Sequence, residues 1–396
     1  MDRIPARVLI HGGETAYHVQ YVRSVLDALE EAGVDHLHLQ PKQSLPTEIQ
    51  GRVRKRIVDV TWKYLKRAPN TFDPEAYHWR GMLDGAAFTR REGVWIGPRG
   101  PFRAPLPFRP DLILTTAPYW GHVLYKVIPW ANAEGIPVLS IDHGAPLLPL
   151  HWGGYRGAMW GCAANACWGQ VSADINIGYG APATGQIVTG SPTLDDLTDL
   201  AEDEGLKTRL GLDPTKRMIL LMSTHTEPLK SAMDRTMRQV IERHGGDEEL
   251  EVVIKPHPQE LLRGTLIDVP DTVRVVRTQE DLHAWIAAAD CIVSPATSVL
   301  IPALALRRPF VNLLGPDSGL GEPEALAALH DLIGDAVLPM EALDGAIRGE
   351  VTVEQAALDR VFERIGFRSD GRNGRRVLDL GAHLVEGGAP EAWVAS

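Results

Sequence analysis

Two stretches of the chain decide its fold class: VVIKPHPQE at residues 252–260 and ADCIVSPATSVLIPALALRRPFVNLLG at residues 289–315. Each combines an apolar run, a short polar loop and a stretch typical of a helix. Uninterrupted apolar runs of this length are typical of parallel strands that helices cover on both faces. The repeated order of strand, loop and helix therefore predicts an open α/β sheet.

The polar loops that follow these two strands predict a phosphate site. Ligands of open α/β sheets bind outside the carboxyl ends of the strands. The second loop carries Ser294, Thr297 and Ser298 around a proline, a pattern that favours a helix start within the loop. A helix N-terminus offers free N–H groups to an anion, so we expect these hydroxyls to bind phosphate beside Lys255 and His257. The alternative is that the hydroxyls only cap the helix.

The bulk properties of the chain indicate a soluble protein of two domains. Its 396 residues exceed one ordinary core, so we expect two domains of roughly 150–200 residues each. A formal net charge of −11 argues against a nucleic-acid partner and leaves at most peripheral membrane contact. The three cysteines form no disulfide framework, and the N-terminus lacks a signal-peptide pattern, so a cytoplasmic location is expected.

The N-terminal half alternates short apolar runs with helical stretches. Strands are expected at residues 7–10, 34–40, 112–114, 138–141 and 186–190. A helix at 16–32 is expected to end at Gly33, which suits a helix C-terminus. Residues 151–168, rich in glycine and tryptophan, predict irregular structure over a ligand cleft.

The C-terminal half repeats this alternation and ends in helices. Strands are expected at residues 218–222, 251–255, 273–276, 291–293 and 310–314. Two such sets in succession predict two doubly wound, Rossmann-like domains. The last helix, near residues 374–384, has an apolar stripe that needs a partner surface. The stripe consists of Val377, Leu378, Leu380, Leu384 and Val385.

Several motifs resemble those of a known family. They are His143-Gly144, Thr189-Gly190-Ser191-Pro192, Lys255-Pro256-His257-Pro258, residues 294–309, and Asp370-Gly371-Arg372. Together they resemble the two-domain GT-B transferases, and most closely the branch of CDP-glycerol glycerophosphotransferases and capsule polysaccharide transferases. The resemblance implies an α/β GT-B fold with two Rossmann-like domains facing across a cleft. It implies an acceptor-side domain at 1–205, a nucleotide-donor domain at 206–365, and a C-terminal helix at 366–396 that crosses back to the first domain.

The chain departs from the family pattern at two places. The glycerophosphotransferase pattern has an aspartate and an aromatic residue where this chain has residues 294–298. Many GT-B transferases also carry a donor-binding glutamate on the next helix, and the matching position here is Pro302. The ribose of a nucleotide donor would then be held otherwise, by Glu322 or by backbone groups.

The resemblance assigns roles to individual residues. It makes His143 the base that removes a proton from the acceptor hydroxyl, for which a histidine pKa near neutrality is suited. His257 lies after a strand, beside Lys255 and the hydroxyl-rich loop, so we expect it to donate a hydrogen bond to the phosphate of the departing nucleotide. The remaining donor-side residues are Lys255, Ser294, Thr297, Ser298, Thr224 and His225, and the acceptor-side residues are His11, Gly12, Gly13 and His122. The alternative for both catalytic histidines is a structural role at a strand end or turn.

These observations predict a transferase of glycan or polysaccharide biosynthesis. It would move a glycosyl or glycerol-phosphate group from a CDP- or UDP-linked donor to a hydroxyl acceptor such as a glycan or lipid-linked glycan. Two alternatives stay open: a nucleotide-sugar 2-epimerase, and a catalytically silent nucleotide-binding subunit. No Asp-x-Asp cluster that would anchor a divalent ion occurs in the loops of interest, so neither a metal nor a cofactor is expected.

Overall fold

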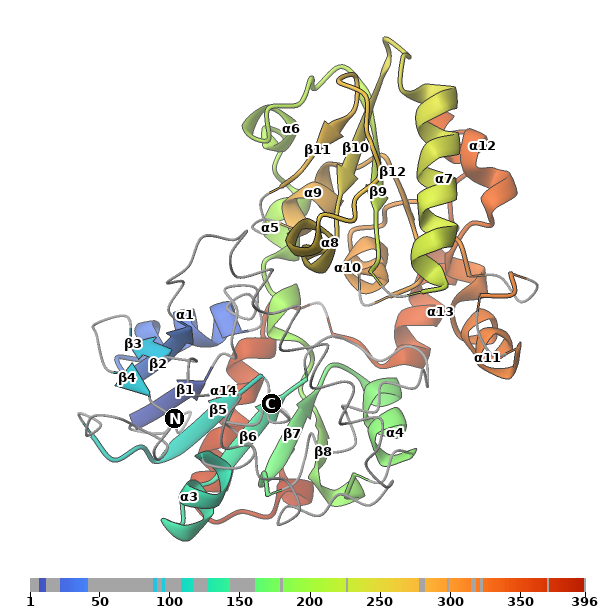
Figure 1. Cartoon of the computed structure of the whole chain (residues 1–396). Helices are drawn as coiled ribbons and strands as arrows, with labels where there is room; N and C mark the ends of the chain where they lie inside the picture. The colour runs from blue at the N-terminus through green and yellow to red at the C-terminus, as the bar shows by residue number, and fades with distance from the viewer. Residues whose placement is uncertain are drawn as a thin grey trace. The chain divides into compact units, whose positions relative to one another are not determined.

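The computed structural model describes residues 7–11, 22–41, 88–90, 95–96, 108–116, 127–142, 161–178, 181–225, 227–277, 282–297, 299–314, 318–320, 323–368 and 370–394. The described residues form two compact α/β units (Figure 1). Unit 1 contains those up to Asp195 and those from Phe367 onward, and unit 2 contains residues 196–366 apart from the undescribed positions. The predicted α/β fold with two Rossmann-like domains is therefore confirmed.

Unit 1 is built on an eight-stranded sheet of order β4-β3-β2-β1-β5-β6-β7-β8. The strands are β1 (Arg7–His11), β2 (Asp35–Pro41), β3 (Phe88–Arg90), β4 (Trp95–Ile96), β5 (Leu112–Thr115), β6 (Val138–Ile141), β7 (Ala164–Cys167) and β8 (Gln186–Val188). Strands β2, β1, β5, β6, β7 and β8 are parallel to one another, whereas β3 and β4 add an antiparallel edge beside β2. The chain winds to both sides of β1, whose neighbours are β2 and β5.

One prediction for this sheet is wrong. The segment 151–168 was expected to be irregular, but β7 occupies Ala164–Cys167 and pairs with both β6 and β8. The sequence of β7 has small and polar residues rather than an apolar run, so it does not look like a strand. All four residues are nevertheless buried, because the side-chain amide of Asn165 donates hydrogen bonds to Asp142 and Gln186 inside the unit. The rest of the predicted irregular segment before residue 161 lies outside the described residues.

The helices of unit 1 include the last helix of the chain. They are α1 (Arg23–Glu31), α3 (Ile128–Ala133), α4 (Gln170–Gly178) and α14 (Asn373–Val385), with the 3-10 turns η5 (Ala183–Gly185), η6 (Pro192–Leu194) and η9 (Pro390–Ala392). Helix α14, red in Figure 1, packs against α1 and β5. Its buried residues Val377, Leu378, Leu380 and Leu384 share a core with Val8 of β1, which confirms the predicted return of the C-terminal helix to the first domain. Val385, predicted in the same stripe, is 37% exposed.

The ends of two helices in unit 1 have local causes. Gly33 adopts φ 64°, and its N–H donates to Glu30 O at 3.1 Å, so the predicted glycine end of α1 is confirmed. Helix α14 begins where Asp195 accepts the N–H groups of Asn373 at 2.9 Å and Gly374 at 2.7 Å. A carboxylate at a helix N-terminus complements the helix dipole, so a residue far away in sequence fixes the start of the last helix.

Unit 2 is built on a five-stranded parallel sheet of order β11-β10-β9-β12-β13. The strands are β9 (Arg217–Met222), β10 (Leu250–Lys255), β11 (Arg274–Val275), β12 (Cys291–Ser294) and β13 (Phe310–Asn312). Four of them match predicted strands closely, while β13 ends before the predicted residue 314. Strand β9 lies in the middle, with β10 and β12 on its two sides, so the chain reverses its winding direction there.

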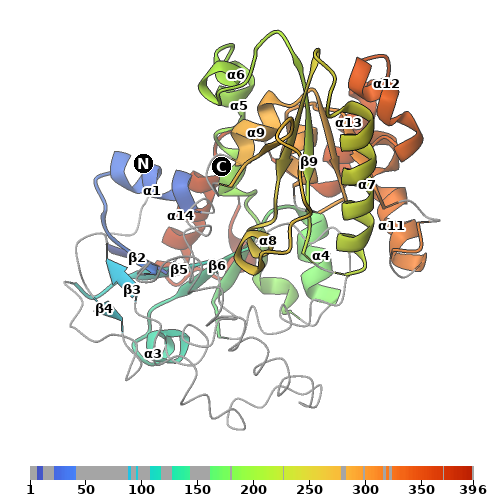
Figure 2. The same cartoon turned by 45° about the horizontal axis from the view of Figure 1, so that its top comes forward.

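Helices cover both faces of this sheet. They are α5 (Leu197–Ala201), α6 (Leu206–Arg209), α7 (Leu229–His244), α8 (Pro258–Arg263), α9 (Leu282–Ala288), α10 (Leu300–Ala305), α11 (Pro323–Ile333), α12 (Leu343–Arg348) and α13 (Gln355–Ile365), with η7 (Gly334–Ala336) and η8 (Met340–Ala342). Figure 2 shows α7 and α9 on opposite sides of β9. Ile219 and Leu221 pack with Met233 and Met237 of α7 in one core, and the alternation of a strand turns their neighbours to the other face.

The segment that leads into unit 2 belongs to it. Helices α5 and α6 flank the predicted domain boundary at residue 205, and both pack against α9. His283 of α9 also lies 3.0 Å from the carboxylate of Asp196. Among the helices of the described residues, none is both long and apolar enough to cross a membrane.

Candidate functional site

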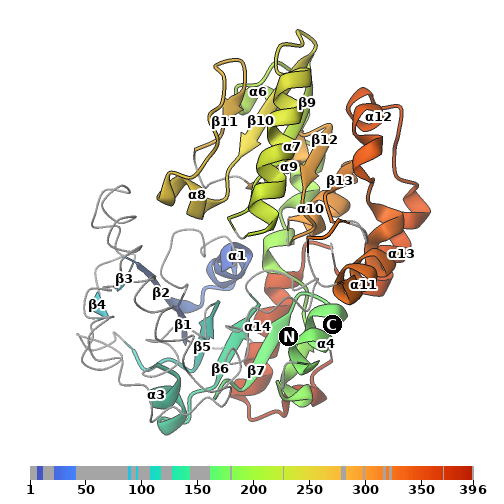
Figure 3. The same cartoon turned by 45° about the vertical axis from the view of Figure 1, so that its right-hand side comes forward.

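The donor-side residues predicted from the sequence gather at one edge of the unit 2 sheet. Strands β9, β10 and β12 are adjacent and parallel, so the loops after them leave the sheet at the same edge. Figure 3 shows α8 and α10, which follow β10 and β12, at this end of the sheet. Because β9 and β12 also mark the point where the winding reverses, this edge is where a doubly wound fold binds its ligand.

Two histidine rings lie against each other at this edge. The ring centroids of His225, after β9, and His257, after β10, are 4.1 Å apart with a tilt of 30° between the ring planes. Burial lowers the pKa of His225, and the charge of Arg263 adds to the effect. Burial, His225 and Arg263 lower the pKa of His257 to about 3. Both rings are therefore neutral at neutral pH, and Nδ1 of His225 is buried without a hydrogen-bond partner.

The backbone of His257 is held by groups that the sequence did not reveal. Its N–H points at Ser223 Oγ at 2.9 Å and at Glu260 Oε2 at 3.2 Å. Its carbonyl accepts the N–H of Glu260 at 2.8 Å. Glu260, the third residue of α8, thus supplies the side-chain half of a capping box to His257, which precedes the helix. The start of α8 thus fixes the backbone of the residue that carries this half-buried ring.

The hydroxyl-rich loop after β12 differs from the prediction. Helix α10 begins at Leu300 with Val299 as N-cap and without a side-chain cap, so the expected helix start at residues 294–298 is wrong. The physical reason is that the side chain of Asn312 binds the backbone of this segment: its Oδ1 accepts the N–H of Ala296 at 2.9 Å. That N–H is therefore not free for an anion. Ser294 ends β12, and Thr297 lies in the turn that leads into α10.

The other described donor-side residues are placed as follows. Lys255 is the last residue of β10 and is only 7% exposed, and Thr224 follows β9 and is 8% exposed. Pro302 is buried inside α10. Within the chain segments that the structure describes, no three histidine, cysteine or acidic side chains form a group that could hold a metal ion.

Several predicted residues cannot be placed. His143, Ser298, Gly12, Gly13, His122 and Glu322 lie outside the described residues. His11 is the last residue of β1, and only its backbone is described. The predicted base and acceptor side therefore stay predictions.

Unit 1 contains a buried polar cluster next to the position of the predicted base, and sequence reasoning missed it. Asp142 Oδ1 accepts hydrogen bonds from Asn165 at 2.8 Å and Asn176 at 3.4 Å, and Gln186 Oε1 accepts from the same two amides. The indole of Trp168 donates to the carbonyl of Asp142 at 3.0 Å. Burial raises the pKa of Asp142 to about 6, although the amide hydrogen bonds oppose this. The residue directly before His143 is therefore held by both its backbone and its side chain.

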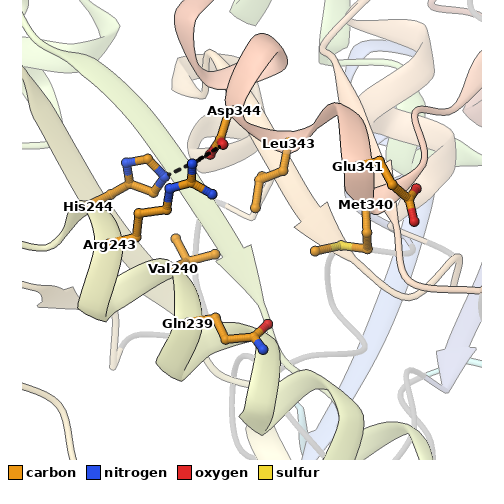
Figure 4. Close-up of a pocket in the computed structure, with 8 residues that line it drawn as sticks. All are labelled: Gln239, Val240, Arg243, His244, Met340, Glu341, Leu343 and Asp344. Carbon is orange, nitrogen blue, oxygen red and sulfur yellow. Dashed lines mark hydrogen bonds and ion pairs between the residues drawn. The ribbon is translucent and has the colours of Figure 1, made fainter.

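A pocket lies elsewhere in unit 2. It has a volume of about 470 Å³ and is lined by α7 residues near His244 and by residues of η8 and α12 (Figure 4). His244 and Arg243 both contact the carboxylate of Asp344 there. Because α7 starts after the carboxyl end of β9 and ends at His244, this pocket is at the far end of the helix from the histidine pair.

Comparisons with known proteins identify the fold. No family model and no curated protein matches the sequence. Among solved structures, a variant of the wall teichoic acid polymerase TagF has a TM-score of 0.61 and 11% identity, covering 97% of this chain and 89% of that chain. The chain has the GT-B fold. S. aureus MnaA with UDP gives 0.55 and 10% identity, covering 96% and 97% of the two chains. The UDP-GlcNAc 2-epimerase of Neisseria meningitidis, bound to UDP-GlcNAc, gives 0.53 and 14%, covering 94% and 98%. At such identities the likeness concerns the fold alone.

Proposed function

We propose that this chain is a GT-B transferase that moves a glycosyl or glycerol-phosphate group from a CDP- or UDP-linked donor to a hydroxyl acceptor. The observation that carries the proposal is the pair of half-buried, neutral histidines at the carboxyl edge of the unit 2 sheet. That edge is the ligand edge of a doubly wound fold. Structures of the same fold include a wall teichoic acid polymerase and proteins solved with UDP or UDP-GlcNAc, which supports a nucleotide-linked donor.

The histidine pair would act on the phosphate of the departing nucleotide. A neutral imidazole carries one N–H donor, and a buried donor stabilises developing negative charge more strongly than one in water. Ser294 and Thr297 would add hydroxyl donors from the neighbouring loop.

The acceptor hydroxyl needs a base, for which we propose His143. Its side chain is not described, but the preceding residue Asp142 is fixed by Trp168, Asn165 and Asn176. A rigid neighbour would hold a base in one position, which is what proton removal from a bound hydroxyl requires.

A nucleotide-sugar 2-epimerase is the second candidate. Its support is that structures named as UDP-GlcNAc 2-epimerases share the fold over nearly the whole chain. An epimerase needs acidic or basic groups that act on the sugar itself, and residues 294–306 contain no carboxylate. We therefore favour the transferase.

A donor panel separates these candidates. The full chain is incubated with CDP-glycerol, UDP-GlcNAc and related CDP and UDP donors, with and without hydroxyl acceptors, and the products are resolved by chromatography. Acceptor-dependent release of free nucleotide supports the transferase, whereas an isomerised sugar on intact nucleotide supports the epimerase. If calorimetry detects binding of neither CDP nor UDP, the chain does not use a nucleotide donor of this kind.

The proposed base makes a specific prediction. His143→Ala should reduce turnover by about 10²-fold or more while donor affinity stays within a few-fold, because a base acts mainly in the transition state. The matched control is His36→Ala in β2, where the ring of His36 bonds the carbonyl of Val34 at 3.0 Å. Near-normal kcat in the His143 variant would remove this residue from the mechanism.

A further inference from the structure

The side chain of Glu260 is the least exposed carboxylate near the histidine pair. Its residue is 0% exposed, although it lies in the short helix α8. Oε2 accepts the N–H of His257 at 3.2 Å and the hydroxyl of Ser223, which reaches over from the loop after β9. Oε1 lies 3.0 Å from the ammonium of Lys230 in the first turn of α7. One carboxylate thus connects the two loops that carry the stacked rings to a helix on the face of the sheet.

Lys230 is the shared partner of two carboxylates in this group. Lys230 also pairs with Asp234 at 2.7 Å, so one ammonium faces two carboxylates. Burial opposes the charged form of Lys230, but the hydrogen bonds that its ammonium donates to Asp234 and Glu260 outweigh this effect and raise the pKa of Lys230.

A helix cap alone does not require this arrangement. A capping-box glutamate needs only to reach the N–H of the N-cap residue, and it does so equally well in water. Here the carboxylate is removed from water and also binds Ser223 and Lys230, neither of which belongs to α8. The extra contacts fix the loop after β9 relative to the loop after β10. The distance between these two loops sets the contact between the rings of His225 and His257.

We propose that Glu260 is a positioning residue, which together with Ser223 and Lys230 fixes the backbone of His257 so that its ring stays packed against His225. The inference rests on the proposed function in that His257 contacts the donor phosphate. The three residues form a clamp that holds the ring away from water before the nucleotide arrives. A preorganised donor has less to reorganise when charge develops on the phosphate.

The sign of one pKa change tests the clamp. The groups that face His257 are His225 from the loop after β9 and Arg263 and Glu260 from α8. Removing the negative charge of Glu260 without any movement would leave the pKa of His257 unchanged or lower it, because a nearby anion favours imidazolium. Releasing the ring into water would raise the pKa instead, because burial is the main cause of its low value.

The experiment is an NMR titration of labelled histidines in the full chain without ligand, with the His257 signals assigned through His257→Gln. In the wild type we expect His257 to stay neutral down to pH 5. In Glu260→Gln we expect it to titrate at a pH higher by about one unit or more, with affinity for CDP or UDP reduced about tenfold. Ser223→Ala, which leaves the buried charges intact, should move the titration in the same direction and serves if Glu260→Gln does not fold.

The matched control is Asp290→Asn. Asp290 pairs with Lys207 at 2.8 Å and accepts the N–H of Met218 at 2.8 Å, before β12 and thus at the opposite edge of the same sheet. The Asp290→Asn variant should lower the stability of unit 2 without changing the pH at which His257 titrates. An unchanged or lower His257 pKa in both clamp variants overturns the inference. If the titration shifts as expected but the wild type binds neither CDP nor UDP, the clamp stands and the proposed function fails.

Discussion

Asn312 shows how one residue shapes the loop beside the candidate site. Its Oδ1 accepts the N–H groups of Ala296 at 2.9 Å and Leu314 at 3.0 Å, and its Nδ2 donates to Leu314 O at 2.8 Å. The side chain is 8% exposed, so these backbone groups depend on it rather than on water. Asn312→Ala should lower the free energy of unfolding of unit 2 by about 3 kcal/mol, because unsatisfied buried groups cost about 1–3 kcal/mol each.

Urea unfolding followed by circular dichroism measures this loss. Gln355→Ala is the control, since Gln355 is exposed and its amide bonds Asp359 in its own helix, and its effect should stay within about 0.5 kcal/mol. An Asn312 variant as stable as this control would mean that the loop does not need the amide.

The loop hydroxyls make a second prediction at this scale. Changing Ser294, Thr297 and Ser298 together to alanine should weaken binding of CDP or UDP by about 2–4 kcal/mol, since a hydrogen bond to a charged group is worth about 1.5 kcal/mol or more. Isothermal calorimetry on the folded variant measures the change. Because α10 begins only at Leu300, the loss of these side chains should leave the helix intact. Unchanged affinity would mean that the loop binds no phosphate.

Among the elements, α14 packs closely against α1 because Gly374 has no side chain. A Cβ on Gly374 would lie 2.8 Å from the carbonyl carbon and 2.9 Å from the carbonyl oxygen of Ser24 in α1. Gly-to-Ala changes within helices normally stabilise by up to about 1 kcal/mol. Here the sign should reverse, and Gly374→Ala should cost about 1–3 kcal/mol because backbone atoms cannot move aside as a side chain can.

Thermal unfolding of unit 1 measures this effect, and α4 offers the control. Gly178 is the last residue of α4, and a Cβ there would meet nothing within 4 Å. Gly178→Ala should therefore change stability by only a few tenths of a kcal/mol. If Gly374→Ala stabilises unit 1 as an ordinary helix glycine would, the two helices do not pack as closely as described.

The sequence predicts those elements whose pattern is local, and not those that depend on contacts between distant elements. Strands such as β10 and β12 were predictable because their apolar runs are local, and α14 because its stripe has the helical period. Strand β7 was not, because its Asn165 is acceptable in a core only through partners on other elements. The pairing of Glu260 with Lys230 was likewise hidden, since neither has a local pattern that points to the other. His225 was found only from its place after a strand.

At the scale of the whole molecule, each unit carries a titratable group with a shifted pKa, and the two groups have opposite effects on stability as the pH falls. In unit 2, the pKa of His257 is lowered to about 3. The unfolded chain therefore binds a proton below about pH 6.5 that the folded unit excludes, so unit 2 loses stability as the pH falls. In unit 1, the pKa of Asp142 is raised to about 6. The folded unit therefore binds a proton before the unfolded chain does, so unit 1 gains stability over the same change.

Lowering the pH from 7 to 5 should therefore destabilise unit 2 by about 2 kcal/mol and stabilise unit 1 by about 1 kcal/mol through these two groups. Hydrogen exchange measured by mass spectrometry, corrected for the intrinsic rates, reports each unit separately through peptides from β9 and β10 and from β6 and β7. His257→Gln should flatten the response of unit 2 alone, and Asp142→Asn that of unit 1 alone. A parallel loss of protection in both units, unaltered by either variant, would show that other groups govern the acid response.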